Sequence, residues 1–220
     1  MLFDFAALPK KDRYKLVVST IVPRPIAWMV TQDAEGRVNA APFSFFNVFS
    51  NDPVVVGIGV GARGMGGEER AEFKDTLANL EATGEFTVCM VSEETAEAMN
   101  VTAADFPPGV DELERAGLTT APSAKVGPPR IAESPVALEC RVWQTIPIGT
   151  HRLVLGEVLA VHVRDDCMLD PRRLYVDTPK LNLIGRMHGG GWYARTTDRF
   201  ELRRVTVDEA EARREGRSAP

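Results

Sequence analysis

The sequence lacks the features that mark several large classes of protein. Lys and Arg together number 26 against 31 Asp and Glu, so there is no excess of positive charge to neutralise nucleic-acid phosphates. No apolar run approaches the roughly 20 residues that a membrane-spanning helix needs. The N-terminus carries Asp4 early, without a basic region or a long apolar core, which is not typical of a secretory signal. We therefore expect no nucleic-acid partner and no membrane span.

Cysteine is scarce as well, with three residues in 220. Their odd number and wide spacing, without a Cys-x-x-Cys pair, do not fit a disulfide framework. We expect the three cysteines to be small, buried, hydrophobic side chains in a protein of the reducing cytoplasm. They are Cys89, Cys140 and Cys167.

Histidine is equally rare, and the three residues lack the spacing of metal ligands, so we expect no metal site. His162 and its neighbours form an apolar run, which favours a structural role. His151 begins a predicted strand after a glycine turn, where it could face a site. Nothing beyond the presence of the residue types supports a serine–histidine–aspartate arrangement.

The stretch from residue 19 to residue 60 is the most informative. It contains three apolar runs, over residues 26–31, 38–49 and 54–60. The polar turn QDAEGR and the pair Asp52-Pro53 separate them. Because these connections are too short for helical crossovers, the runs predict an antiparallel meander of three strands.

The middle run contains an unusual segment, PFSFFN. Pro42 cannot donate to a sheet ladder, so it predicts an edge strand or a bulge. Ser44 and Asn47 would add side-chain donors beside the flat rings of Phe45 and Phe46, which suits a planar phosphorylated cofactor. The alternative is a core strand whose rings only pack, and the segment alone favours that alternative.

Further strands and helices follow at close intervals. The predicted strands cover residues 85–91, 136–146 and 151–163, the last two as a long hairpin. The predicted helices cover residues 73–82, 92–101 with Ser92 as N-cap, and 111–116. Strands outnumber helices without β-α-β alternation. This pattern predicts a mainly β fold, a closed antiparallel barrel with peripheral helices.

We expect one large domain over residues 19–205, flanked by two terminal segments. Residues 1–18 are predicted to form an N-terminal arm, with a short helix near Pro9. Residues 206–220 are predicted to form a charged C-terminal tail.

Two segments could contact a ligand. Lys74 precedes a predicted helix whose first turn carries Thr76, so ammonium, hydroxyl and free N–H groups could converge on an anion. A solvated Lys74 and a Thr76 that only caps the helix explain the pattern equally well. The glycine-rich stretch 185–193 holds Arg186 and Tyr193, and it suits either close approach to a ligand or a plain surface loop.

Seven segments recur together in a known family. They are RPIAWMVT (24–31), GRVNAAPFSFFN (36–47), SNDP (50–53), KDTLANL (74–80), TGEF (83–86), HRLVLGEV (151–158) and GRMHGGGWY (185–193). In this order they resemble the flavin reductase-like, FMN-binding split-barrel family, in its longer, flavoprotein oxygenase-like branch. The resemblance extends from about residue 13 to residue 200.

The resemblance implies an antiparallel split β-barrel that forms a homodimer with FMN at the subunit interface. Residues 44–47 would follow the ring system and the ribityl chain, and Lys74 with Thr76 would hold the phosphate. His151 would lie on the nicotinamide side. The residues that the resemblance assigns to the cofactor are Arg24, Ser44, Phe45, Phe46, Asn47, Arg63, Lys74, Asp75, Thr76, Arg186 and Tyr193.

The implied activity is that of an NAD(P)H:FMN oxidoreductase. Hydride would pass from nicotinamide to flavin, and the reduced flavin would serve oxygen, another acceptor or a partner monooxygenase. An FMN-binding electron carrier or flavin store without nicotinamide activity is the first alternative. A split barrel that binds pyridoxal phosphate or haem is the second.

Overall fold

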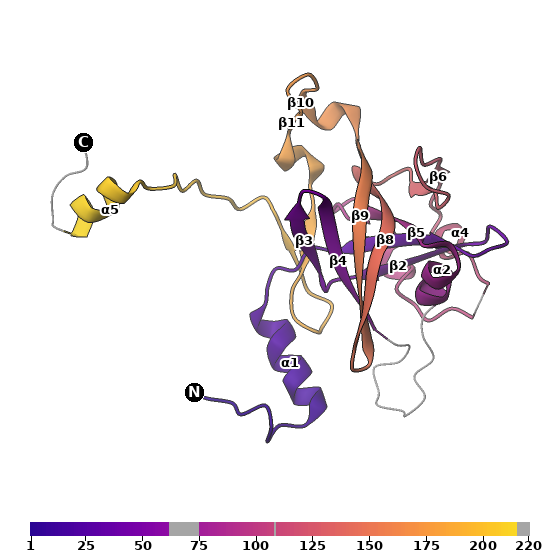
Figure 1. Cartoon of the computed structure of the whole chain (residues 1–220), viewed down its shortest axis with the longest axis horizontal. Coiled ribbons are helices and arrows are strands. Elements are labelled where there is room, and N and C mark those ends of the chain that lie inside the picture. Colours follow the sequence, from indigo (N-terminus) through magenta and orange to yellow (C-terminus); the bar gives the residue numbers. More distant parts are fainter. Residues whose placement is uncertain (62–74, 108, 215–220) are drawn as a thin grey trace.

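A seven-stranded antiparallel sheet forms the centre of the fold (Figure 1). The computed structural model describes residues 1–61, 75–107 and 109–214. The strands follow the order β2-β1-β5-β8-β9-β4-β3 across the sheet. They are β1 (Ala27–Gln32), β2 (Val38–Phe43), β3 (Phe46–Asn51), β4 (Val54–Gly61), β5 (Glu85–Met90), β8 (Val136–Ile148) and β9 (His151–Val163). The prediction of a mainly β, antiparallel fold is confirmed.

The middle run of the predicted meander is two strands rather than one. β2 pairs with β1 and β3 pairs with β4, so these consecutive strands form opposite edges of the sheet. Pro42 lies on edge strand β2 opposite Trp28, as its missing N–H group predicts. Ser44 and Phe45 join the two edge strands, so the sheet curls and brings its edges together at this point. We call residues 44 and 45 the sheet corner.

Strand β1 is buried on both of its faces. Ala27 and Met29 belong to one apolar cluster, which α2 (Asp75–Thr83) covers with Leu77. Trp28 and Val30 belong to a second cluster on the other side of the sheet. This two-sided burial explains why β1 is a continuous apolar run without polar alternation.

The long hairpin formed by β8 and β9 is confirmed. Glu139 on β8 is an acidic residue, yet its side chain is 0% exposed. The proline-rich segment over residues 122–129 covers this face of β8. The backbone N–H groups of Ala124 and Lys125 donate to the Glu139 carboxylate at 2.7 and 2.5 Å. His162 on β9 binds the same carboxylate, as a structural histidine does.

The part of the chain that the structure describes contains five α-helices. They are α1 (Lys10–Thr20), α2 (Asp75–Thr83), α3 (Ala96–Val101), α4 (Glu112–Arg115) and α5 (Val207–Arg214). The predicted helices at α2 and α4 are confirmed, and Asp111 caps α4 through the N–H groups of Leu113 and Glu114. The predicted cap at Ser92 is wrong. Ser92 forms a bridge to Leu183 and donates its N–H group to Thr95 Oγ1, so the helix begins only at Ala96.

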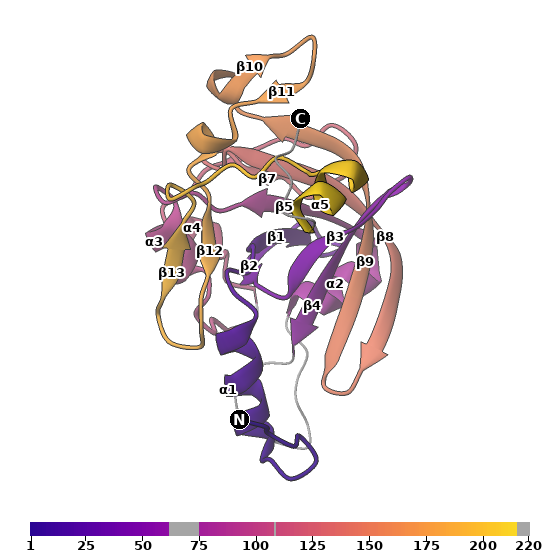
Figure 2. The same cartoon turned by 90° about the vertical axis from the view of Figure 1, so that its left-hand side faces the viewer.

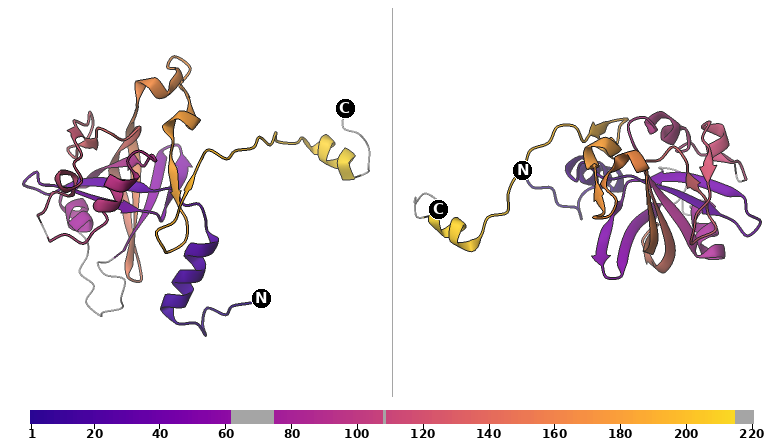
Figure 3. Two further views of the ribbon diagram at one scale, coloured as in Figure 1. Left: turned by 180° about the vertical axis from the view of Figure 1, so that it is seen from behind. Right: turned by 90° about the horizontal axis from the view of Figure 1, so that it is seen from above.

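Short elements complete the described chain. They are β6 (Thr120–Ala121), β7 (Arg130–Ile131), η1 (Asp165–Cys167), β10 (Met168–Asp170), β11 (Tyr175–Val176), η2 (Thr178–Leu181), β12 (Ile184–Arg186) and β13 (Tyr193–Arg195). The β12–β13 hairpin lies beside α1 (Figure 2). Beyond β13 the chain is extended and carries α5 away from the sheet (Figure 3). No helix of the described residues is long and apolar enough to span a membrane.

Candidate functional site

Arg24 links three separate segments at the sheet corner. Its side chain is 7% exposed, and Nη1 donates to the carbonyl oxygens of Val18 and Ile21 at 2.7 and 2.9 Å. Nη2 donates to the Met187 carbonyl oxygen at 2.6 Å, and Nε donates to Ser44 Oγ at 3.4 Å. Arg24 therefore holds α1, the exit of β12 and the sheet corner together. Sequence reasoning assigned Arg24 to the cofactor, and most of its N–H groups are already used within the chain.

Arg186 and Tyr193 lie next to this cluster. The backbones of Arg24 and Arg186 exchange hydrogen bonds of 2.9 and 2.8 Å, which fixes the position of β12. The Arg186 guanidinium carbon lies 4.7 Å from the centroid of the Tyr193 ring, a cation–π distance. Both side chains line a cavity of about 170 Å³, which we call the Arg186 cavity. Its other lining residues are Ile26, Pro42, Phe43, Ser44, Met99, Asn100 and Ala103.

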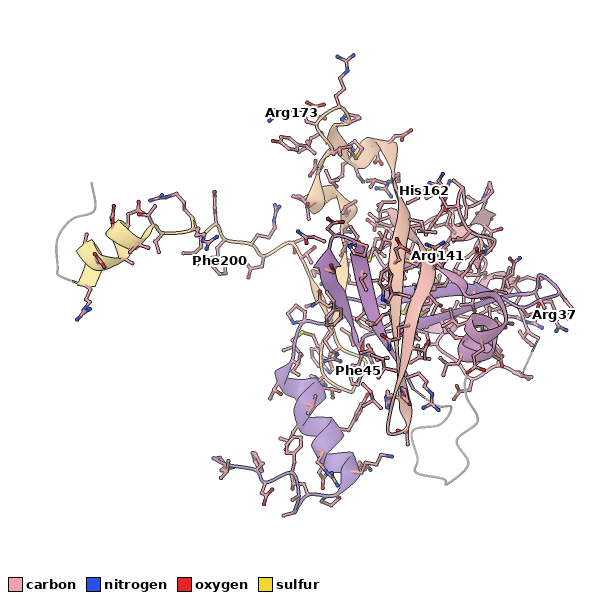
Figure 4. All side chains as sticks on the ribbon, viewed as in Figure 1. Arg37, Phe45, Arg141, His162, Arg173 and Phe200 are labelled. Atoms are coloured by element: carbon pink, nitrogen blue, oxygen red, sulfur yellow. The ribbon has the colours of Figure 1, made fainter. Side chains whose placement is uncertain are left out.

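On the other side of the corner, the rings of Phe45 and His151 lie nearly parallel. Their centroids are 6.1 Å apart, with an angle of 22° between the planes. Phe45 is 38% exposed, and Figure 4 shows it near the end of the sheet that faces α1. Tyr14 of α1 approaches the Phe45 ring with a centroid distance of 6.5 Å. We call the rings of Phe45 and His151 the aromatic platform.

Two glycines of β4 make room for this platform. A Cβ atom on Gly59 would lie 3.0 Å from Phe45 Cβ, and one on Gly61 would lie 3.1 Å from His151 Nε2. A side chain at either position would require the neighbouring ring to shift by a few tenths of an ångström. These two glycines are not among the predicted site residues, although glycine at alternate positions of a strand is a signal of close approach.

The two predicted residues that follow the sheet corner, Phe46 and Asn47, have different surroundings. Phe46 is partly buried and packs against the first apolar cluster, as the core interpretation expects. Asn47 is exposed, and its side-chain oxygen accepts the N–H group of Val48 at 2.8 Å. Ser44 and Phe45 are thus the two members of PFSFFN at the junction of the Arg24 cluster and the aromatic platform.

The predicted phosphate site is described only in part, because Arg63 and Lys74 lie outside the described residues. Thr76 is 1% exposed, and its hydroxyl group donates to Asn39 Oδ1 at 3.0 Å. Asp75, Asp105 and Glu112 line a small cavity beside it.

Glu112 is itself buried. Burial raises the pKa of its carboxyl group, although the carboxylate accepts N–H groups from Ala40 at 3.0 Å and Asn39 at 2.7 Å. The Thr76 hydroxyl group belongs to the same network, because it donates to Asn39, and it therefore stabilises the fold. A phosphate at the start of α2 would depend on backbone N–H groups and on cations from the undescribed segment.

Thiol and metal chemistry find no support in the described residues. The three cysteines are buried and unpaired, as expected, and burial raises the pKa of the Cys89 thiol to about 11. No group of His, Cys, Asp or Glu within the described ranges could hold a metal ion. His151 and His162 lie at opposite ends of β9, and Figure 4 labels His162 far from Phe45.

Known proteins share this architecture. The family model described as flavin reductase like domain matches residues 19–179, which include all strands of the large sheet and the sheet corner. An uncharacterised protein of Deinococcus radiodurans is 45% identical over 222 residues, covering 97% of this chain and 96% of the relative. The crystal structure of Pseudomonas fluorescens 2-nitrobenzoate 2-nitroreductase is 33% identical with a TM-score of 0.84, covering 94% of this chain and 98% of that chain. Nitrilotriacetate monooxygenase component B from Bacillus cereus is 31% identical with a TM-score of 0.84, covering 92% and 98%.

Proposed function

This chain belongs to the flavin reductase-like family, and we propose that it is an FMN-binding oxidoreductase that uses NADH or NADPH. The observation that carries the proposal is the aromatic platform beside the sheet corner. A planar ring system stacks favourably on flat aromatic side chains, and Phe45 is 38% exposed with the nearly parallel ring of His151 beside it. The nitroreductase and the monooxygenase component at more than 30% identity support an oxidoreductase role.

The residues of the corner suit a flavin in distinct ways. Phe45 offers a ring face, and Ser44 and Asn47 offer polar groups within a few residues of it. Arg24 acts through Ser44 and Met187, so we treat it as a positioning residue rather than a ligand. When bound, FMN supplies the acceptor for hydride, since its N5 atom takes hydride from C4 of the nicotinamide.

We assign His151 to the nicotinamide side of the site. It stands at the first position of β9, opposite Gly61 of β4, and its ring is partly exposed beside Phe45. In this position His151 can orient the nicotinamide ring against the flavin ring. Orientation of two bound reactants accounts for a large part of catalysis in reactions that need no acid or base from the protein.

We further propose a homodimer with FMN at the interface, in the reducing cytoplasm. Edge strand β3 and the outer part of β8 expose large apolar side chains, among them Phe49 at 65% and Trp143 at 57%. Apolar surface of this kind favours a second subunit. Gel filtration of the FMN-loaded protein tests the proposal, and a folded, loaded monomer contradicts it.

Replacing Lys74 with alanine should raise the dissociation constant for FMN. Charge-assisted hydrogen bonds contribute about 1.5–3 kcal/mol each, so we expect a change of about tenfold or more. Quenching of flavin fluorescence in a titration measures the constant. Lys125→Ala is the control, because that side chain is exposed and only its backbone N–H group binds Glu139. An unchanged constant in Lys74→Ala would refute the phosphate assignment.

A further inference from the structure

We propose that the Arg186 cavity is the binding site for the organic substrate, a carboxylate carried on one small planar ring. This inference rests on the proposed flavin chemistry, because it names the substrate that is bound beside the cofactor. It also reassigns Arg186 and Tyr193, which the family resemblance gives to the cofactor, to the substrate. Three features of the cavity carry it: its volume, the polarity of its walls and its charge.

The volume selects a single ring. A cavity of about 150 Å³ holds one benzene molecule in other proteins, and the Arg186 cavity measures about 170 Å³. Ile26, Phe43 and Met99 form buried apolar walls, so the bound group must be mostly apolar.

The charge selects an anion. Arg186 is the charged residue among those that line the cavity, and no lining residue is acidic. Within the described ranges, the salt bridges do not include Arg186. Arg24, a second cation, is bridged to Arg186 through the backbone and interacts with it electrostatically, so two positive charges lie at this side of the cavity. A positive field disfavours the cationic ring of an oxidised nicotinamide and favours a carboxylate.

The guanidinium group is held in place before any ligand binds. The backbone of Arg186 is fixed by its exchange of hydrogen bonds with Arg24, and its side chain lies over the Tyr193 ring. Because Arg can donate two parallel N–H groups to a carboxylate, a fixed guanidinium at the wall of an apolar cavity recognises the head group of the substrate. The apolar walls then recognise its ring.

Calorimetric titration with benzoate tests the proposal directly, with benzamide as the uncharged analogue. We expect benzoate to bind the FMN-loaded wild type and benzamide to bind at least about tenfold more weakly. Arg186→Gln should weaken benzoate binding by at least about tenfold and leave benzamide binding nearly unchanged. Arg195→Gln is the matched control, because Arg195 on β13 is exposed and pairs with Glu93.

A second variant protects the test against misfolding of Arg186→Gln. Ala103 lies at the exposed rim of the cavity, so Ala103→Leu should fill space without changing charge and should weaken both probes. The affinity for FMN is measured separately in each variant. Loss of benzoate binding with unchanged FMN affinity supports the proposal.

Two results would overturn the substrate proposal. One is the absence of binding heat when millimolar benzoate is added to the wild type, and the other is an equal loss of affinity for FMN and for benzoate in Arg186→Gln. A protein that binds benzoate as proposed but takes up no FMN would instead refute the flavin function alone.

Discussion

Arg24→Ala is expected to lower the free energy of unfolding by about 2–4 kcal/mol and to weaken FMN binding. The substitution leaves the buried carbonyl oxygen of Val18 and the partly buried ones of Ile21 and Met187 without this donor. A buried polar group without a partner costs about 1–3 kcal/mol, and partial entry of water limits the sum. The sheet corner loses its contact at Ser44 as well, so both effects arise from one side chain.

Urea unfolding measures the first effect and flavin titration the second. Arg24→Lys should behave almost like Arg24→Ala, because one ammonium group cannot reach three segments in the geometry of a guanidinium. The flavin titrations are carried out under conditions in which circular dichroism shows each variant to be folded. Arg24→Lys with the stability and FMN affinity of the wild type would contradict a positioning role.

Glu139→Ala is expected to lower the free energy of unfolding by about 3–5 kcal/mol, because two charge-assisted hydrogen bonds worth about 1.5–3 kcal/mol each are lost. Its carboxylate accepts the N–H groups of Ala124 and Lys125 and binds His162. Without it, the segment over residues 122–129 loses its attachment to β8. Glu157→Ala is the control, because its exposed ion pair with Arg141 on the same hairpin should contribute less than about 1 kcal/mol. Equal losses in the two variants would contradict the account.

The same carboxylate predicts how stability depends on pH. Burial acts to raise the pKa of Glu139, but the hydrogen bonds from Ala124, His162 and Lys125 outweigh it and hold the pKa below its ordinary value. A carboxyl group with a lowered pKa in the folded state stabilises the fold above its unfolded pKa of about 4.3. That stabilisation is lost as the pH falls through the folded pKa. Unfolding of Glu139→Gln should therefore depend less on pH in the acidic range than unfolding of the wild type.

Local patterns were sufficient to predict much of the fold. The β8–β9 hairpin, strand β5 and helix α2 follow from alternation, periodicity and turn residues within each segment. Pro42 also predicted an edge strand, because its missing N–H group acts locally. The predicted site residues came from the family resemblance, and the structure brings four of them, Arg24, Ser44, Arg186 and Tyr193, to one place.

Features that depend on distant contacts could not be predicted in this way. The separation of β2 and β3 to opposite edges is decided by which strands pair across the sheet, and each run alone looks like a strand. Glu139 has an ordinary strand pattern around it, and its burial comes from a segment 14 residues earlier in the chain. Arg24 binds the Met187 carbonyl oxygen across 163 residues, a contact without any local signal.

Anaerobic addition of NADH, and then of NADPH, to the purified protein tests the central claim most directly. The visible spectrum should show the bands of oxidised flavin, and they should bleach with at least one of the two donors. Flavin bands that persist with both donors would contradict the reductase function and leave an electron carrier or flavin store. A colourless protein that added FMN does not restore would contradict flavin binding itself.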